Sequence, residues 1–132
     1  MENKILVDTD FLFALVIESD AHHTAAIEKI QKYEKEHLFI TSFTIPEAVT
    51  VISHKVSQEQ ARKFLKQARE SKFTVIDLEE KFMIKTDEIF IAQKKKGTSW
   101  ADCLNVAAIL TYRLDGILSF DRFYKQVGIS VF

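Results

Sequence analysis

The stretch ILVDTDFLF, residues 5–13, decides how this chain is interpreted, because it places two aspartates inside a run that otherwise has the composition of a protein core. Burying an unpaired carboxylate is costly, so each acid there needs a partner, contact with solvent, or a cation. The aliphatic residues before the first aspartate suit a strand that is buried on both faces. We therefore expect a central strand at Lys4–Val7, an acidic turn at Asp8, and a buried helix over Phe11–Ile17.

The bulk composition is typical of one folded domain covering residues 1–132. The chain is 47% hydrophobic and 28% charged, with one proline and three glycines. Its net charge of −1 excludes a global field that attracts nucleic acid or an anionic membrane. The single cysteine, Cys103, excludes an internal disulfide and a multi-cysteine zinc site. No segment is long and apolar enough to cross a membrane, and we expect a cytoplasmic protein without membrane association.

Along the rest of the chain, predicted helices alternate with predicted strands. Helices are expected at Ala21–Glu36, Ile45–Val56, the segment opened by Ser57, Glu79–Lys95 and Trp100–Arg113, and strands at Leu38–Thr41, Phe73–Ile76, Ile117–Ser119 and Ile129–Phe132. This alternation favours an α/β fold in three layers, with a mostly parallel sheet covered by helices on both faces.

Four acidic residues follow predicted strands or open predicted helices: Asp8, Glu47, Asp102 and Asp121. Ligands of open parallel sheets bind at the carboxyl ends of the strands, where these positions converge. Helix capping explains three of them equally well, because Thr44-x-x-Glu47 and Ser99-x-x-Asp102 fit a capping box and Asp121 fits the start of a short helix. Asp8 follows a buried strand directly, and we expect no capping role for it.

Four carboxylates at one sheet edge repel one another unless a cation lies among them, and oxygen ligands without histidine or cysteine favour Mg²⁺ or Mn²⁺. The four histidines have no metal-binding spacing and are interpreted as surface or packing residues. Asn105, on the helix face of Asp102, and Ser42 and Ser119, each just past a strand, are candidate supporting residues. A local turn or cap hydrogen bond explains each of these three about as well.

Four short motifs in order carry a resemblance to a known family: VDTDFLF, PEAV, SWADCLNVAAIL and ILSFDRFYKQVGISVF. Together they resemble the acidic motifs of PIN-domain nucleases, of the small single-domain kind found as VapC-type toxins. The resemblance covers residues 5–132. It implies a parallel sheet in the strand order 3-2-1-4-5, a homodimer, and an antitoxin partner. It also implies that Asp8, Glu47, Asp102 and Asp121 bind one or two divalent ions, with Ser119 supporting the last acid.

Asp10 departs from this pattern, because the family usually has a small polar residue at that position. Its role is left open between an added metal ligand and a hydrogen bond to the loop.

The function we expect is metal-dependent hydrolysis of RNA, with basic residues around the acidic cleft holding the substrate. The candidates for that grip are Lys55, Arg62, Lys63, Lys66, Arg69 and Lys94–Lys96. An alternative is a phosphatase of the haloacid dehalogenase type, with Asp8 as nucleophile and Asp10 as acid and base, but the late motif supplies only one acid. A non-catalytic module that binds RNA or a protein is the other alternative.

Overall fold

A computed structural model of the chain describes residues 2–132. Its elements in chain order are β1 (Lys4–Val7), α1 (Thr9–Val16), α2 (His23–Tyr33), β2 (His37–Thr41), α3 (Thr44–Lys55), α4 (Gln58–Arg69), β3 (Thr74–Ile76), α5 (Glu80–Ala92), α6 (Trp100–Tyr112), β4 (Gly116–Leu118) and α7 (Phe123–Gln126). None of the helices within residues 2–132 is long and apolar enough to cross a membrane.

The strands form a parallel sheet in the order β3-β2-β1-β4, so β1 is central as its aliphatic sequence predicted. The predicted fifth strand at Ile129–Phe132 is reduced to one parallel bridge between Val131 and Ile117. The final segment nevertheless runs close to β4, because a Cβ on Gly116 would lie 2.4 Å from the Ser130 carbonyl oxygen. The predicted order 3-2-1-4-5 is therefore correct for four strands, and its fifth member is a single bridge.

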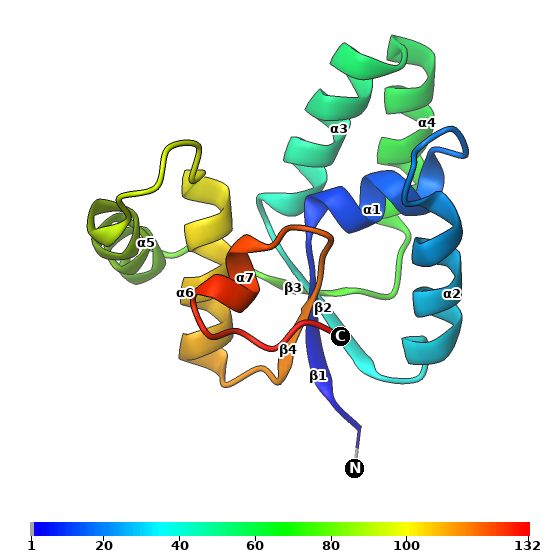
Figure 1. The fold of residues 1–132 in the computed structure, drawn as a ribbon. Helices are drawn as coiled ribbons and strands as arrows, with labels where there is room; N and C mark the ends of the chain where they lie inside the picture. The colour runs from blue at the N-terminus through cyan, green and yellow to red at the C-terminus, as the bar shows by residue number, and fades with distance from the viewer. Residues whose placement is uncertain (1) are drawn as a thin grey trace.

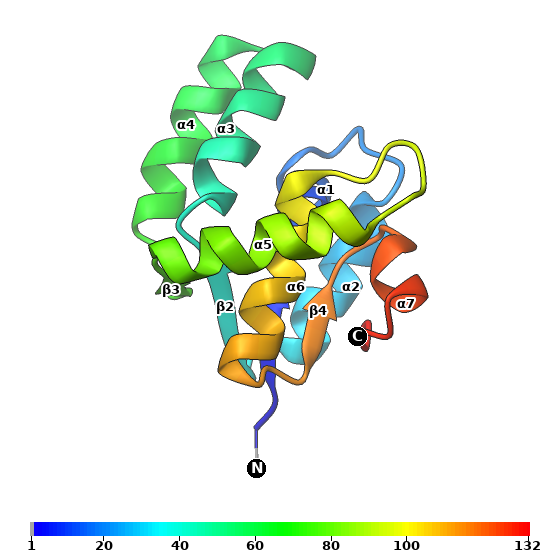
Figure 2. The same cartoon turned by 90° about the vertical axis from the view of Figure 1, so that its left-hand side faces the viewer.

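Helices cover both faces of the sheet, as Figures 1 and 2 show. On one face, Ile5 and Val7 of β1 pack with α1 to α4, and on the other face Leu6 packs with α5, α6 and α7. This alternation follows from the two-residue period of a strand. All three side chains are fully buried, which explains why residues 5–7 of β1 include no polar side chain. The hairpin of α3 and α4 projects beyond the sheet at the end where β1 finishes.

Several element boundaries differ from the predictions by one to three residues, and three differences bear on the site or have a clear local cause. Helix α1 begins at Thr9, two residues earlier than expected, because the Asp8 side chain accepts a hydrogen bond from the Thr9 N–H and caps the helix. Helix α5 ends at Ala92 because Gln93 is already extended, with ψ of 137°. The short helix after Asp121 is present as α7, although Arg122 occupies its N-cap position.

Candidate active site

Asp8 lies at the junction of β1 and α1 with both carboxylate oxygens engaged. Oδ1 accepts hydrogen bonds from the Thr9 N–H at 2.8 Å and from Asn105 Nδ2 at 3.0 Å, and Oδ2 accepts one from Ser119 Oγ at 2.8 Å. The residue is only 5% exposed. The expectation that Asp8 has no capping role is wrong, because it is the N-cap of α1. Its bonds to Asn105 and Ser119 are not part of a cap, and they tie it to α6 and to the end of β4.

Asp10 and Ser119 complete this part of the site. The Phe120 N–H donates to Asp10 Oδ2 at 3.1 Å, and Ser119 Oγ lies 3.2 Å from Asp10 Oδ1. The Ser119 hydroxyl has one proton for two carboxylates, and its oxygen also accepts from the Asp121 N–H at 3.0 Å. Asp10 therefore makes a hydrogen bond to a loop, the one after β4, which is one of the two roles left open for it, and it also lines the same pocket as Asp8.

Glu47 is not a capping residue. The capping box predicted with Thr44 does not form, because Thr44 is the first residue of α3 and its hydroxyl accepts from the Thr41 N–H at 3.1 Å. The Glu47 carboxylate instead accepts a hydrogen bond from the Thr9 hydroxyl of α1. Thr9 was not among the predicted site residues, although it stands between the two aspartates of the opening motif.

The backbone of Asp102 takes part in the N-cap of α6, and its carboxylate belongs to the acidic pocket. Ser99 Oγ caps α6 by accepting a hydrogen bond from the Asp102 N–H at 3.0 Å. This bond is the half of the capping box that the Ser99 side chain makes. The Asp102 carboxylate accepts from the Tyr124 hydroxyl at 2.8 Å, and that hydroxyl accepts from Asn105 Nδ2 at 3.0 Å. Because Asn105 also donates to Asp8, one side-chain network connects Asp8 to Asp102.

Sequence reasoning missed Tyr124 in this network. The sequence offered one indication of its role: Tyr124 lies three residues after Asp121, close to a candidate acid. A tyrosine that is buried there needs a hydrogen-bond partner for its hydroxyl. Tyr124 is fully buried.

Asp121 is exposed and has two roles. Its Oδ1 accepts a hydrogen bond from the Phe123 N–H at 2.9 Å, and its side chain lines the pocket. Ser42 does not join the acids. Its hydroxyl accepts from the Leu78 N–H at 3.0 Å and connects the end of β2 to the segment after β3. Of the predicted supporting residues, Asn105 and Ser119 contact the acids and Ser42 does not.

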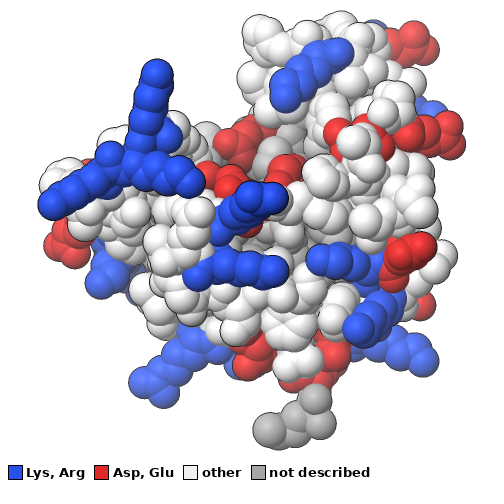
Figure 3. All heavy atoms as spheres, viewed as in Figure 1, with Lys and Arg blue, Asp and Glu red and all other residues white. Residues whose placement is uncertain are grey.

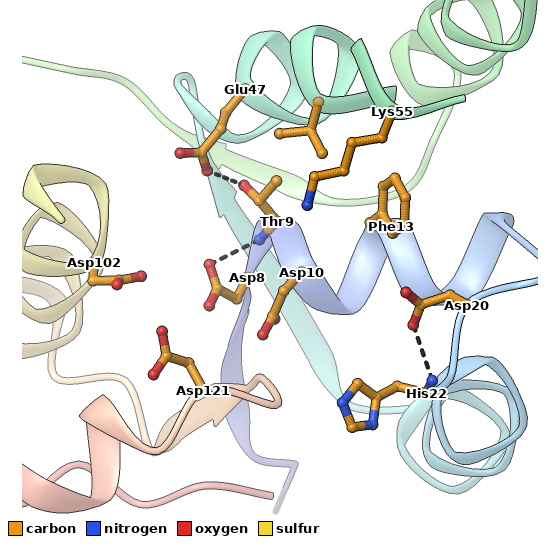
Figure 4. A pocket seen from close by; sticks show the side chains of 11 residues that line it. Asp8, Thr9, Asp10, Phe13, Asp20, His22, Glu47, Lys55, Asp102 and Asp121 are labelled. Carbon is orange, nitrogen blue, oxygen red and sulfur yellow. Dashed lines mark hydrogen bonds between the residues drawn. The ribbon is translucent and has the colours of Figure 1, made fainter. Parts of the chain in front are cut away.

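The acidic side chains line one pocket of about 310 Å³ at the carboxyl ends of the strands. Figure 4 shows Asp8 and Asp10 near the centre of the view, Glu47 above them, and Asp102 and Asp121 to their left. In the space-filling view, acidic atoms are visible in a central hollow with basic side chains around it (Figure 3). Within residues 2–132, no three acidic, histidine or cysteine side chains lie close enough together to hold one ion as they stand.

The electrostatics of the pocket favour neutralisation of its acids. Burial, with the neighbouring Asp10 and Asp102, raises the pKa of Asp8 well above its ordinary value. Burial raises the pKa of Asp10 to about 6, against the lowering effect of its bonds to Phe120 and Ser119. Burial and nearby carboxylates also raise the pKa of Glu47 and of Asp102. In the described part of the chain the one ion pair joins Lys81 and Glu79, so no lysine or arginine neutralises these acids.

This donor set fits a hard divalent cation. Every candidate ligand is a carboxylate oxygen, and hydroxyl or amide groups of Thr9, Asn105, Ser119 and Tyr124 orient those oxygens. Mg²⁺ commonly uses one or two protein carboxylates and keeps several waters, so it does not require three direct ligands. The second layer of hydrogen bonds is the kind that fixes metal-binding side chains.

Comparison with solved structures shows the same fold in several proteins. The chain is similar to VapC20 of Mycobacterium tuberculosis, a toxin that cleaves the sarcin-ricin loop, at 18% identity and a TM-score of 0.85, with 96% of each chain covered. It is also similar to VapBC2 from Rickettsia felis, solved with a promoter DNA fragment, at 14% identity and a TM-score of 0.70, covering 98% of this chain and 97% of that one. DNA-bound VapBC from Salmonella typhimurium matches at 17% identity and a TM-score of 0.67, covering 100% and 98%.

A search of curated protein sequences finds no match. A scan against protein-family models, in contrast, matches the PIN domain over residues 5–129. The match includes all four acids and the network that connects Asp8 to Asp102. The chain therefore belongs to the PIN domain family.

Proposed function

We propose that this PIN-domain protein is a Mg²⁺- or Mn²⁺-dependent ribonuclease that hydrolyses RNA phosphodiester bonds. The observation that carries the proposal is the convergence of Asp8, Glu47, Asp102 and Asp121 on one pocket, from four separate segments, without a basic partner. A bound divalent ion lowers the pKa of its water and polarises a phosphoryl oxygen, which is the chemistry that phosphodiester hydrolysis needs.

The chain's own residues hold the acids for that task. Asp8 is fixed by Asn105 and Ser119, and Asp102 by Tyr124. These bonds lower the freedom of each carboxylate before a substrate arrives, so little reorganisation is needed when charge develops. Glu47 and Asp121 lie nearer the mouth of the pocket, where they are partly or fully exposed, and complete the set of four ligands.

Basic residues near the acids supply a grip for the phosphate backbone. Lys55 lines the acidic pocket itself. An adjoining hollow, lined by Lys95, Lys96 and Arg122, shares Asp102 and Asp121 with that pocket. The other predicted candidates do not line either hollow: these are Lys94 and, on α4, Arg62, Lys63, Lys66 and Arg69. Phosphate contacts of this kind weaken with salt, so RNA affinity should fall as ionic strength rises.

The toxin role is part of the same proposal. The solved structures that this chain is similar to include a VapC toxin and VapBC complexes, which supports a partnership with an antitoxin protein. A homodimer of one-domain chains is the assembly we expect.

The two alternative functions, a phosphatase and a non-catalytic binding module, differ in how well the structure and the family match support them. Membership of the PIN family gives no support to a phosphatase of the haloacid dehalogenase type. In addition, both Asp8 oxygens already accept hydrogen bonds and the residue is only 5% exposed, which is poor placement for a covalent nucleophile. A non-catalytic RNA-binding module differs from the proposed enzyme only in the absence of cleavage, and the following experiment separates them.

The experiment is incubation of the purified protein with total RNA from its host in Mg²⁺, in Mn²⁺, or in EDTA, followed by mapping of new RNA ends. We expect discrete new ends with either metal and none in EDTA. Glu88→Gln serves as a matched control, because Glu88 is an exposed acid on α5 far from the four in sequence and outside the pocket. Cleavage that persists in EDTA, or no new ends under any condition, would refute the proposed activity.

Tyr124→Phe is expected to weaken Mg²⁺ or Mn²⁺ binding by about tenfold, because residues that orient metal ligands typically contribute 10- to 100-fold to affinity or activity. The loss of one buried hydrogen-bonded hydroxyl should also lower the free energy of unfolding by about 1 kcal/mol. Calorimetric metal titration and urea unfolding measure the two effects. Tyr112→Phe is the control, since Tyr112 is 42% exposed on the same helix as Asp102. Metal affinity unchanged in Tyr124→Phe would show that the hydroxyl only supports the fold.

A further inference from the structure

We propose that the acidic pocket continues into a subsite for one unpaired RNA nucleotide, whose base stacks on His22 and whose phosphate contacts Lys55. This inference rests on the proposed ribonuclease function and assigns His22 and Lys55, two residues outside the four acids, to recognition of the RNA.

The shape of the pocket supports a subsite beyond the acids. The cavity that holds Asp8 and Asp10 extends along α1 to His22 on one side and to Phe13 and Lys55 on the other. Figure 4 shows Asp8, Asp10, Glu47, Asp102 and Asp121 on one side of the pocket and the His22 ring and the Lys55 side chain on the other side, where the Asp20 carboxylate lies beside His22. The volume of about 310 Å³ lies within the range of sites that enclose small ligands. A nucleotide adjoining the reacting phosphate would extend from the four candidate metal-binding acids toward His22 and Lys55.

Aromatic rings lead from the core to this end of the pocket. Phe11 is fully buried and stacks on Phe120, with ring centroids 5.6 Å apart and planes inclined by 16°. Phe120 in turn stacks on His22 at 4.4 Å with planes inclined by only 7°. His22 is exposed and lines the pocket, so the stack ends in a ring that contacts solvent there. The backbone of His22 is held by Asp20, whose carboxylate accepts from its N–H at 2.9 Å.

A nucleobase is the natural continuation of such a stack. Bases of single-stranded RNA bind proteins largely by stacking on aromatic side chains, histidine included, and each stacked base contributes strongly to affinity. A base inside a duplex is already stacked and paired, so it cannot occupy this position without being extruded. The subsite therefore selects RNA in which at least one nucleotide beside the scissile bond is unpaired.

Lys55 supplies the charge that this end of the pocket needs. Its ammonium lies 6.0 Å from the centre of the Phe13 ring, at the end of α3. Among the described residues Lys55 forms no ion pair with the pocket acids, so its charge is available to a phosphate. No other lysine or arginine lines this pocket within residues 2–132. This end of the pocket therefore offers one aromatic ring for a base and one cation for a phosphate, and its one carboxylate, Asp20, is engaged by the His22 N–H.

The test measures equilibrium binding of a fluorescent single-stranded RNA oligonucleotide with Ca²⁺ in place of the catalytic metal, and cleavage of the same oligonucleotide with Mg²⁺. The oligonucleotide contains the mapped cleavage site, or is the tightest binder from a set of varied sequences if no site is mapped. We expect His22→Ala to weaken binding by about 5- to 150-fold, the range for loss of one stacked base. His22→Phe should bind within about twofold of wild type, because it keeps the ring. Lys55→Gln should weaken binding and reduce its salt dependence, and Lys55→Arg should preserve both.

Two substrate changes sharpen the test. Annealing the oligonucleotide to its complement should abolish cleavage, and an abasic scan should find one position where removing the base weakens wild-type binding but leaves His22→Ala unaffected. His54→Ala and Lys85→Gln are the matched controls, since both residues are exposed and outside the pocket.

The outcomes separate this inference from the proposed function. Wild-type binding that depends on His22 and on one base, without cleavage, would support the subsite and refute the ribonuclease. Cleavage with unchanged binding in His22→Ala would refute the subsite alone. Equal cleavage of single strand and duplex, or His22→Phe as weak as His22→Ala, would also overturn it.

Discussion

Asp8→Asn is expected to lower the rate of RNA cleavage by about a thousandfold, because the amide removes a negative charge from the centre of the acid cluster while keeping its size and shape. The Asp8 carboxylate accepts hydrogen bonds from three residues, Thr9, Asn105 and Ser119, and is therefore held more firmly than the other acids. Single-turnover cleavage at saturating metal measures the effect. A rate within a few fold of wild type would remove Asp8 from the proposed catalytic set.

The same variant should not lose stability in EDTA. An asparagine oxygen can still accept from Thr9 and Asn105, and its amide can donate to Ser119 Oγ, whose proton is then free for Asp10. Removing a buried charge that repels Asp10 and Asp102 should leave the free energy of unfolding equal or higher at pH 7.5. Urea unfolding checks the sign. A clear loss of stability together with normal cleavage would mean that Asp8 serves only as the cap of α1.

Without divalent ions, the protein should lose stability through Asp10 as pH rises from about 4 to above 6. The pKa of this carboxyl is raised from 3.8 to about 6 in the folded state, so the folded protein binds more protons than the unfolded chain between those values. The contribution is therefore fully present below about pH 4 and is lost as pH passes through about 6. A shift of that size corresponds to roughly 3 kcal/mol in the free energy of unfolding.

Asp10→Asn isolates this contribution. Relative to wild type, the variant should become progressively more stable as pH rises from 4 to 7.5 in EDTA, and Mg²⁺ should reduce the difference at pH 7.5 by neutralising the wild-type acids. Urea unfolding at a series of pH values measures it. A difference between the two proteins that is independent of pH would contradict the raised pKa of Asp10.

Much of the fold was predictable because its signals are local. The unbroken aliphatic run before Asp8 predicted a central strand, and the apolar periodicity of the later helices predicted their faces. Glu47, Asp102 and Asp121 come after strands or at helix starts in the sequence. Because these positions meet at one edge of a parallel sheet, the sequence predicted that the three acids would converge. The structure places all three beside Asp8 in one pocket. Whether they bind metal remains a prediction.

The errors arise where one residue has two tasks or where a partner is distant in sequence. Asp8 is both a helix cap and a member of the acid cluster, and a sequence pattern presents those as alternatives. Tyr124 contacts Asn105 and Asp102 only because α7 packs on α6, so its role depends on tertiary contacts. The histidines were interpreted as surface or packing residues, and His22 does pack on Phe120, yet its ring also lines the pocket.

The most direct test of the central claim, that these carboxylates bind a divalent cation, is calorimetric titration of Mn²⁺ into the wild-type protein, Asp8→Asn and Glu88→Gln at pH 7.5. We predict saturable binding to the wild type and to Glu88→Gln, and binding to Asp8→Asn that is lost or weakened by more than about tenfold. No saturable binding to the wild type at millimolar Mn²⁺, or equal binding to all three proteins, would contradict the account.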